Sequence, residues 1–435
     1  MTASPAQSFN PRPLNAEPGG RGFRTGRWRV VVLLWFVAFS NFLARLLPTT
    51  MHGSLVAAIP MTEAQFGLLT SSLFWTYGLV SPFAGFVADR FNRSRVIITT
   101  IAVWSTITWL ASYTRTFEQL VILRALMGVS EACYYPAALA LIADYHKGRT
   151  RSLATAIHQT GYIVGVGLSG LGGWVAERTS WHYAFALVGL SGIAYSVPLA
   201  LLLRDAPRES RYGADSGETQ SPVRFGRAMA SLFRRKSFIL TVIIMGLLGV
   251  TGYTIIAWMP VFLQEHFHLT QGRAGMSATG YMNAVSLPGL IIGGVWADRW
   301  TRTNPRARMF VPAIGLVLAA PGILLTANAS ILFMAVLGLV IYRLFASFFE
   351  PNIMPMLCEV VDPRYRATGY GMLNMTATFG AGFGIYFSGI LRDSKIDLHQ
   401  FFDFFPAVFI LCALLLTFIK KRAVAEAAPV PAILN

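Results

Sequence analysis

The sequence predicts an all-α membrane protein in which twelve transmembrane helices are arranged as two six-helix bundles. Hydrophobic residues make up 54% of the 435 residues and charged residues only 13%, a composition far too apolar for a soluble globular protein. Apolar runs long enough to cross a bilayer recur along the whole chain. The two halves also share charged residues at one constant offset, which indicates a duplicated bundle.

The expected spans have about the length that a helix needs to cross the hydrocarbon core of a membrane. They are residues 28–50, 67–89, 95–113, 118–143, 151–176, 182–203, 238–263, 272–297, 308–327, 330–357, 367–391 and 400–420.

The remaining segments divide the chain into domains. Residues 1–27 are rich in proline, glycine and arginine and are expected to be a disordered cytoplasmic tail rather than a signal peptide. The N-terminal bundle covers 28–203 and the C-terminal bundle covers 238–420. Between them, the polar segment 204–237 is a cytoplasmic linker, and 421–435 form a second cytoplasmic tail.

Lysine and arginine report the orientation of the chain. The N-terminal tail, the even-numbered loops and the C-terminus carry 28 of them, whereas the odd-numbered loops carry five. This asymmetry places both termini in the cytoplasm. The net charge of +16 therefore reflects topology and does not indicate nucleic acid. We expect an integral protein of the plasma membrane, the inner membrane in a bacterium, that is surrounded by the lipid bilayer and is a monomer.

The fourth expected span carries one arginine and one glutamate in an otherwise apolar run, Arg124 and Glu131. Seven residues are almost two helical turns, so both side chains leave the same face about 10 Å apart, too far to pair with each other. A charged side chain in hydrocarbon costs at least a few kcal/mol, so this face must contact protein or a wet cavity. We interpret it as the wall of a transport pathway. Alternatively, each charge is neutralised by a neighbouring helix.

This charge pattern recurs in the tenth span at an offset of 219 positions. The two sets are Arg124, Glu131 and Pro136, and then Arg343, Glu350 and Pro355. Pro351 and Asn352 follow the second glutamate, which predicts a broken helix whose freed backbone groups face protein or water. The second pair therefore lines the cavity or forms a structural pair between spans.

A loop motif recurs in the same way. The segment from Gly85 to Arg93 after the second span returns as the segment from Gly294 to Arg302 after the eighth. With this G-x-x-x-D-R-x-x-R signature the chain resembles the major facilitator superfamily over essentially its full length. The resemblance implies the major facilitator fold, with two bundles that rock about a central cavity. It also implies a set of residues that brace the cytoplasmic gate, namely Asp89, Arg90, Arg93, Asp298 and Arg299.

Within this superfamily the chain looks most like the anion:cation symporter family of organic-anion carriers. The matching features are Arg45 in span 1, Phe74 and Tyr77 in span 2, Arg124, Glu131 and Pro136 in span 4, and Trp258 and Pro260 in span 7. The resemblance implies that Arg45 and Arg124 bind the substrate carboxylate and that Glu131 carries the coupling proton. Many members have an acid directly before the first arginine, whereas this chain has Ala44.

The span-4 segment, R-x-x-x-G-x-x-E-A, also resembles the Spinster-like lysolipid carriers. Span 4 alone therefore does not choose the family.

The chemistry of the residues agrees with an anion site. Arginine keeps its charge at any relevant pH and offers a planar fork of donors that suits a carboxylate. By depth, Arg45 and Arg124 reach similar levels and are able to clamp one anion. Co-entry of a proton on Glu131 would remove the roughly 2.3 kcal/mol per 100 mV that opposes entry of an anion into a negative interior.

Further polar residues in the spans are weaker candidates. His158 is expected either to relay a proton or to be a satisfied interior residue. Candidate substrate contacts are Tyr77, Gln159, Tyr253, Asn283 and Asn374.

The sequence contains no constellation typical of an enzyme, a metal site or a cofactor site. The first hypothesis is a proton-coupled symporter of a small organic anion, such as a sugar acid or another monocarboxylate. The second is a Spinster-like carrier of lysolipids or other amphiphiles, whose cavity would be largely apolar. The third is a receptor on the same scaffold that binds ligand without moving it.

Overall fold

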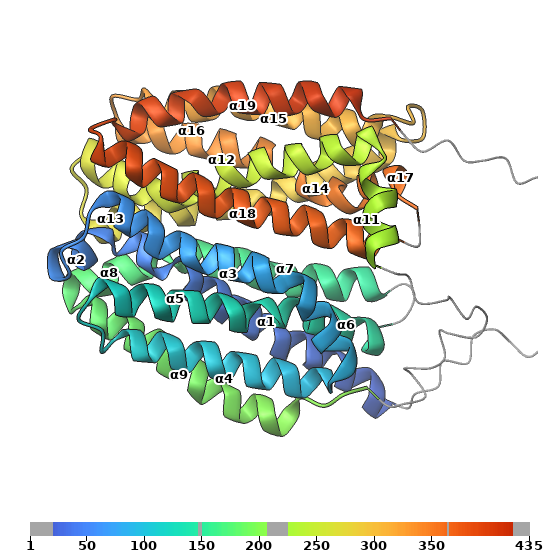
Figure 1. Cartoon of the computed structure of the whole chain (residues 1–435), viewed down its shortest axis with the longest axis horizontal. Helices are drawn as coiled ribbons and strands as arrows, with labels where there is room; N and C mark the ends of the chain where they lie inside the picture. The colour runs from blue at the N-terminus through green and yellow to red at the C-terminus, as the bar shows by residue number, and fades with distance from the viewer. Residues whose placement is uncertain (1–20, 147–149, 207–224, 363–364, 421–435) are drawn as a thin grey trace, which may run out of the picture.

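The computed structural model describes residues 21–146, 150–206, 225–362 and 365–420. Within these ranges the regular secondary structure is helical throughout, which confirms the predicted all-α fold class. The long helices run side by side in two halves, which lie one below the other in Figure 1. The expected tail at 421–435 lies outside these ranges.

The first half contains the helices that precede the linker. They are α1 (Arg21–Thr50), α2 (His52–Ala58), α3 (Glu63–Arg90), α4 (Arg93–Ala111), α5 (Phe117–Ala132), α6 (Tyr134–Tyr145), α7 (Arg151–Leu168), α8 (Gly170–Arg178) and α9 (Trp181–Leu202). Helix α1 begins at Arg21, so part of the expected N-terminal tail is helical.

The second half begins inside the expected linker, because 204–237 contains a complete short helix. The helices are α11 (Phe225–Phe233), α12 (Lys236–His266), α13 (Gln271–Met276), α14 (Met282–Trp300), α15 (Ala307–Ala327), α16 (Leu332–Ala346), α17 (Ile353–Val360), α18 (Arg366–Asp393) and α19 (Leu398–Phe418). A π-helical turn (Ser277–Tyr281) joins α13 to α14, and a 3₁₀ turn (Glu350–Asn352) precedes α17.

Eight helical segments in the described part of the chain are long and apolar enough to cross a membrane. The other expected spans correspond to α3, α7 with α8, α13 with α14, and α18. Helix α3 packs along α18, and α7 packs against α14, so these helices contact the opposite half. Protein contact explains why they are less apolar than lipid-facing helices, and the number twelve stays a prediction.

The two halves meet most closely at the end of the bundle that carries α2 and α13, on the left in Figure 1. We call this the α2 end, and the opposite end, which carries α11 and α17, the α11 end. A Cβ atom added to Gly170 of α8 would lie 2.6 Å from the backbone of Gly275 in α13. Only glycine permits this approach. The amide of Gly170 also donates to the Thr279 hydroxyl at 3.2 Å.

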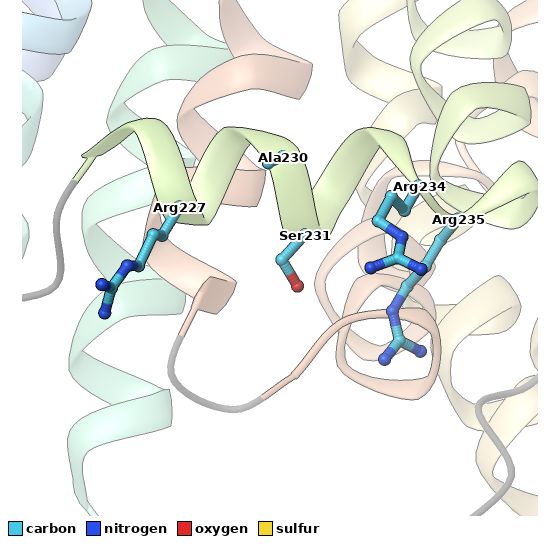
Figure 2. A pocket seen from close by; sticks show the side chains of 5 residues that line it. All are labelled: Arg227, Ala230, Ser231, Arg234 and Arg235. Atoms are coloured by element: carbon cyan, nitrogen blue, oxygen red, sulfur yellow. The ribbon is translucent and has the colours of Figure 1, made fainter.

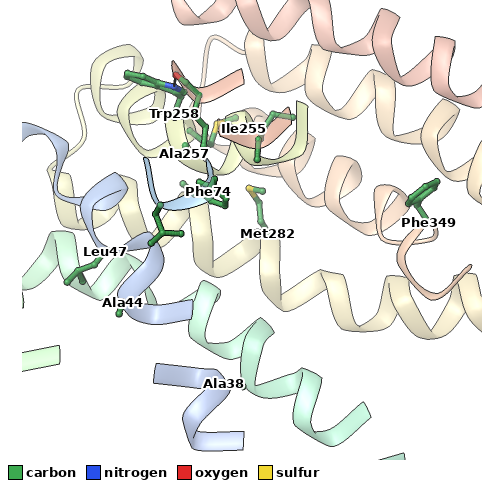
Figure 3. Packing of buried hydrophobic residues seen from close by; sticks show 14 of the residues in the cluster. Ala38, Ala44, Leu47, Phe74, Ile255, Ala257, Trp258, Met282 and Phe349 are labelled. Carbon is green, nitrogen blue, oxygen red and sulfur yellow. Dashed lines mark hydrogen bonds between the residues drawn. The ribbon is translucent and has the colours of Figure 1, made fainter. Parts of the chain in front are cut away.

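Apolar packing is continuous across the two halves. Buried side chains of α1, α3, α12 and α14 belong to one cluster, and Figure 3 shows part of it, including Leu47, Phe74, Trp258 and Met282. Trp258 is fully buried and donates its indole N–H to the Ile385 carbonyl of α18 at 3.2 Å. The interior of the bundle is therefore a packed apolar core, so any charged side chain buried in it needs a hydrogen-bond or ion-pair partner.

The tenth expected span is broken, as its prolines predict. Helix α16 ends at Ala346, the 3₁₀ turn follows, and α17 begins at Ile353. The fourth span has a milder interruption between α5 and α6 at Cys133. The two breaks lie beside Glu131 and Glu350, so each repeated glutamate sits where helical geometry changes.

Candidate functional site

Arg45 of α1 and Glu131 of α5 form a buried ion pair. Nε and Nη2 of Arg45 both donate to Oε2 of Glu131, at 2.9 and 2.6 Å. The side chains are 5% and 0% exposed. Among the described residues, Oε1 of Glu131 has no hydrogen-bond partner, and neither has the buried Nδ2 of Asn41, one helical turn before Arg45. Both hydrogen bonds from Arg45 therefore fall on one carboxylate oxygen, and the Asn41 side chain lies close to the Glu131 carboxylate.

Arg124 of α5 completes the cluster without joining the ion pair. Its Nη2 donates to the backbone carbonyl of Arg45 at 2.7 Å, its Nη1 lies 3.6 Å from Sδ of Met127, and Nε has no partner in the described ranges. Arg124 itself is 3% exposed. The cluster thus contains two guanidinium groups and one carboxylate, which pairs with Arg45 alone, so it carries a surplus positive charge suited to an anion.

Gly128, which lies between Arg124 and Glu131 in α5, positions Glu131. A Cβ atom at Gly128 would lie 2.2 Å from Oγ1 of Thr76 and 2.3 Å from the carbonyl of Leu73 in α3. The hydroxyl of Thr76 also donates to the Ala125 carbonyl at 2.8 Å. Helix α5 therefore lies directly against α3 at this level, and one turn later Glu131 is held inside the bundle.

Aromatic rings surround the Arg45 guanidinium. Its central carbon lies 4.7 Å from the ring centroids of Phe42 and Tyr77 and 5.9 Å from that of Phe74. Such cation–π contacts stabilise a desolvated guanidinium. The sequence analysis named Tyr77 and Phe74 and missed Phe42. Its position three residues before Arg45 on the same helix was the available signal.

A cavity of about 240 Å³ lies mainly among the helices of the second half, with Tyr162 of the first half in its wall, beside this cluster. Arg343 and Glu350 line it and form an ion pair at 2.9 Å, with side chains 10% and 34% exposed. Two predicted contacts, Tyr253 and Asn374, also line it. Most of the other lining residues are apolar or aromatic, namely Tyr162, Met245, Leu248, Ile256, Leu316, Tyr342, Phe349, Ile353, Tyr370 and Phe409.

Two aromatic contacts connect the charge cluster to this cavity. Tyr162 of α7 packs edge-on against Phe42, with ring centroids 4.3 Å apart. Tyr253 of α12 packs in the same way on Phe74, at 4.9 Å. Phe42 and Phe74 contact the Arg45 guanidinium, whereas Tyr162 and Tyr253 line the cavity. A ligand in the cavity is therefore separated from the cluster by a thin aromatic wall.

The repeated arginine–glutamate motif is used differently in the two halves. Arg343 reaches Glu350 of its own span, whereas Glu131 pairs with Arg45 from another helix. The break after Ala346 explains this difference, because a chain that leaves the helix no longer holds residues seven apart at the helical separation. The Arg343–Glu350 pair therefore lies within one span and lines the cavity, which agrees with the first of the two alternatives and not with a pair between spans.

Three other predicted residues lie elsewhere among the described residues. Nε2 of His158 lies 2.8 Å from the hydroxyl oxygen of the buried Tyr134. Gln159 is exposed and donates to the Tyr135 hydroxyl at 3.2 Å. Asn283 is buried and donates to the backbone carbonyl four residues before it. Their functional roles stay predictions.

The residues expected at the cytoplasmic gate lie at the α11 end. Arg93 pairs with Asp144 of α6, within the first half. Asp298 accepts from Nη2 of Arg308 in α15 at 3.2 Å, within the second half. The Asp89 side chain lies outside the described residues. Two further members of the set are exposed, namely Arg90 and Arg299. Their role in a gate stays a prediction.

Arg392, one of the five basic residues counted in the odd-numbered loops, links the halves at the α2 end. Its Nη1 and Nη2 donate to both oxygens of Glu265, at 3.0 and 2.8 Å, and its Nε donates to Oε2 of Glu63 at 3.2 Å. The same oxygen of Glu63 lies 3.1 Å from Nε2 of His52. No sequence motif predicted this network, because it forms between helix ends that are far apart in the sequence.

Comparison with known proteins agrees with this architecture. Residues 34–385 and 306–432 match the profile of the Major Facilitator Superfamily. The MFS-type efflux pump of Mycolicibacterium smegmatis is 25% identical over 377 residues, which cover 85% of each chain. Protein spinster homolog 1 of Xenopus laevis is 25% identical over 68% of this chain, and this chain spans only 59% of that relative's length.

A solved structure supports the fold. A bacterial homolog of the human lysosomal transporter Spinster, in its inward-facing and occupied conformation, superposes with a TM-score of 0.76. The match covers 94% of this chain and 100% of that chain at 20% identity. At this identity the likeness shows the fold alone, and the resemblance to anion:cation symporters stays a prediction. On its sequence profile and its fold, this chain belongs to the Major Facilitator Superfamily of membrane transporters.

Proposed function

We propose that this protein is a proton-coupled symporter of an organic anion that has an apolar part, and that it works by alternating access. One observation carries the proposal. The buried Glu131 has Arg45 as its only ion-pair partner among the described residues, and we propose that the substrate anion competes for this guanidinium when the aromatic wall between the cavity and Arg45 moves. Arg124 lies beside the pair with no described carboxylate of its own.

Competition for Arg45 supplies the coupling. When a substrate anion takes the guanidinium, Glu131 loses its partner and becomes an uncompensated charge in a buried site. Binding of a proton to Oε1 removes that charge. Conversely, protonation of Glu131 releases Arg45 for the anion. Because linkage is reciprocal, each ligand favours binding of the other.

The charge balance fits symport across a polarised membrane. One anion and one proton move no net charge together, so the membrane potential does not oppose them. A lone anion would meet about 2.3 kcal/mol per 100 mV. Transport with this stoichiometry is expected to respond to a pH gradient and to be nearly insensitive to potential.

The duplicated halves support alternating access. Transporters of this type place the site between repeats that rock against each other. The two halves of this chain are held together at the α2 end by Arg392 and by the Gly170–Gly275 contact. The similar solved structure of the bacterial Spinster homolog is inward-facing. By the distribution of basic residues, we assign the α11 end to the cytoplasm of a bacterial plasma membrane.

The lining of the cavity favours an amphiphile as the substrate. One ion pair, Arg343–Glu350, lies in a wall otherwise formed mainly by apolar and aromatic side chains. Such a wall suits a molecule with a charged head and an apolar part. This supports the lysolipid-type alternative. A small hydrophilic monocarboxylate, such as a sugar acid, is the second candidate, and the surplus charge of Arg124 favours it.

Uptake into proteoliposomes tests the proposal. Purified protein is reconstituted with an inward proton gradient, and the external probes are fluorescent lysophosphatidylglycerol and radiolabelled glucuronate. We expect gradient-dependent accumulation of the lysophospholipid. Arg124→Gln is expected to abolish it, whereas Arg115→Gln, which removes an exposed arginine just before α5, is expected to leave it intact. Accumulation of glucuronate alone would select the second candidate, and accumulation of neither probe would contradict the proposal.

A further inference from the structure

Helix α11 lies across the end of the bundle and is not one of the long helices. In Figure 1 it runs roughly perpendicular to α12, α15 and α18 at the α11 end. Ala228 and Leu232, one turn apart, are each 1% exposed. The side chain of Leu232 lies beside Gly369 of α18, 3.6 Å from where a Cβ atom there would stand. One face of this short helix is therefore docked on the second half.

The face that is not docked is basic. Arg227 and Ser231 lie one turn apart on α11, and Arg234 and Arg235 follow directly after its end. Figure 2 shows these four side chains projecting toward the same side. With Ala230 they line an open hollow of about 460 Å³. Arg227 and Arg234 are exposed, and Arg235 donates from Nη1 to the Val360 carbonyl at 3.3 Å. Three positive charges thus surround one hydroxyl in a concave site.

The described residues supply no counter-charge to this site. None of Arg227, Arg234 and Arg235 forms an ion pair with a carboxylate in the described ranges. Helix α11 itself has no acidic residue. Three like charges close together repel one another unless an anion is shared between them. Arginine is the side chain best suited to phosphate, because its planar fork donates two parallel hydrogen bonds.

The depth of the site indicates where the anion comes from. Arg235 directly precedes α12, a helix of 31 residues that is long enough to cross a membrane. The arginine face therefore lies at the level where a membrane span leaves the hydrocarbon. Just inside, Ile239 and Ile243 of α12 are 37% and 44% exposed and one turn apart, which forms an apolar strip. A ligand with a charged head and acyl chains matches this order of charged and apolar surface.

We propose that Arg227, Arg234 and Arg235 form a binding site for the phosphate of an anionic phospholipid headgroup, with Ser231 as an additional donor. The acyl chains then lie along Ile239 and Ile243. Because α11 belongs to the segment that joins the two halves, a bound lipid fixes this helix at the membrane surface. The site is separate from the cavity and does not depend on the identity of the transported substrate.

Native mass spectrometry of the full-length protein tests this site. The protein is released from nanodiscs that contain equal amounts of dioleoylphosphatidylglycerol and dioleoylphosphatidylcholine, and retained lipids are counted. We expect preferential retention of phosphatidylglycerol. The triple variant R227Q/R234Q/R235Q is expected to lose this preference, because each basic residue near an anionic headgroup contributes about fivefold in affinity.

A matched control removes the same charge from the same end of the bundle. R29Q/R95Q/R302Q changes three exposed arginines outside α11 and is expected to retain the lipid like the wild type. Thermal unfolding in phosphatidylcholine alone verifies that both triple variants fold. Equal retention by the α11 variant, or equal loss by the control, would overturn the proposal. Thermal unfolding also compares the two possible sources of the phosphate. If free glycerol 1-phosphate stabilises the wild type against thermal unfolding as strongly as phosphatidylglycerol does, the assignment to a lipid is overturned.

Discussion

At the scale of single residues, the arrangement of Arg45 and Glu131 decides what the protein can do. Arg45 uses two nitrogens on one carboxylate oxygen and leaves the other oxygen without a described partner. A structural ion pair gains most when every donor and acceptor is satisfied. The incomplete pairing of Glu131, together with the unpartnered Nε of Arg124, therefore supports a functional cluster over a purely structural one.

The stability of variants checks how tightly the pair is coupled. Arg45→Gln leaves Glu131 as an uncompensated buried charge, so we expect a loss of about 3–5 kcal/mol in the free energy of unfolding. The double variant R45Q/E131Q removes that charge as well and is expected to recover much of the loss. Chemical unfolding in detergent micelles measures both. Losses that simply add would show that the two side chains do not depend on each other.

The sequence predicted which charged residues belong to the site, but it did not predict which side chains they contact. A charged side chain in an apolar span is visible without a structure, so Arg45, Arg124 and Glu131 could be named. The pairing of Glu131 with Arg45 could not be predicted, because it depends on the relative rotation of α1 and α5. Phe42 and Tyr162 were missed for a related reason, since one aromatic ring among many gains a role only from the neighbour on which it packs.

At the scale of helices, glycine contacts set how closely the halves approach. Gly170 meets the backbone of Gly275 at a distance that excludes a Cβ atom. We expect Gly170→Ala to push α8 and α13 apart and to favour conformations that are open at the α2 end. Gly371→Ala is the matched control, because a Cβ atom at Gly371 of α18 meets nothing within 4 Å.

Distances between spin labels measure this effect. Labels on Thr179 and Ser394, both exposed at the α2 end of different halves, are compared in a background without the three native cysteines. Gly170→Ala is expected to shift the distribution toward longer distances, and Gly371→Ala is expected to match the wild type. An unchanged distribution of label distances in Gly170→Ala would mean that another contact sets how closely the two halves approach at the α2 end.

Breaks in helices were partly predictable. Pro351 and Pro355 predicted the interruption between α16 and α17, because proline has no backbone N–H to donate to the helical hydrogen bonds. The complete helix α11 within the expected linker was not predicted. Its nine residues (Phe225–Phe233) are too few to form a stable helix alone, and its docking on α18 supplies the stability that local sequence lacks.

At the scale of the whole molecule, Arg392 of α18 ties the two halves together at the α2 end through Glu63 of α3, while Glu265 of α12 holds Arg392 from within its own half. Arg392→Gln removes the ion pair that joins the halves, so we expect a population open at the α2 end that is up to a few-fold larger, since a partly exposed pair contributes about 1 kcal/mol or less. The same spin-label pair measures it. Arg178→Gln is the control, because Arg178 stacks on Trp174 of its own helix, 4.1 Å from the ring centroid. Equal shifts in both variants would show a general effect of charge.

The fold as a whole was predictable because membranes restrict it so strongly. Apolar length, a constant repeat offset of 219 and the charged loop motif were sufficient for the class, and the family profile agrees. The position of the cavity was not predictable. Its lining combines α12, α16 and α18 with Tyr162 of the first half, and only tertiary packing brings these residues together.

Comparison of coupled and uncoupled transport by Glu131→Gln tests the central claim most directly. With Glu131 as the coupling site, this variant should still exchange internal for external substrate in counterflow, because Arg45 remains free to bind the anion. It should not accumulate substrate in response to a proton gradient. Glu118→Gln, at the first turn of the same helix, should do both. Gradient-driven accumulation by Glu131→Gln at the wild-type level would contradict the account.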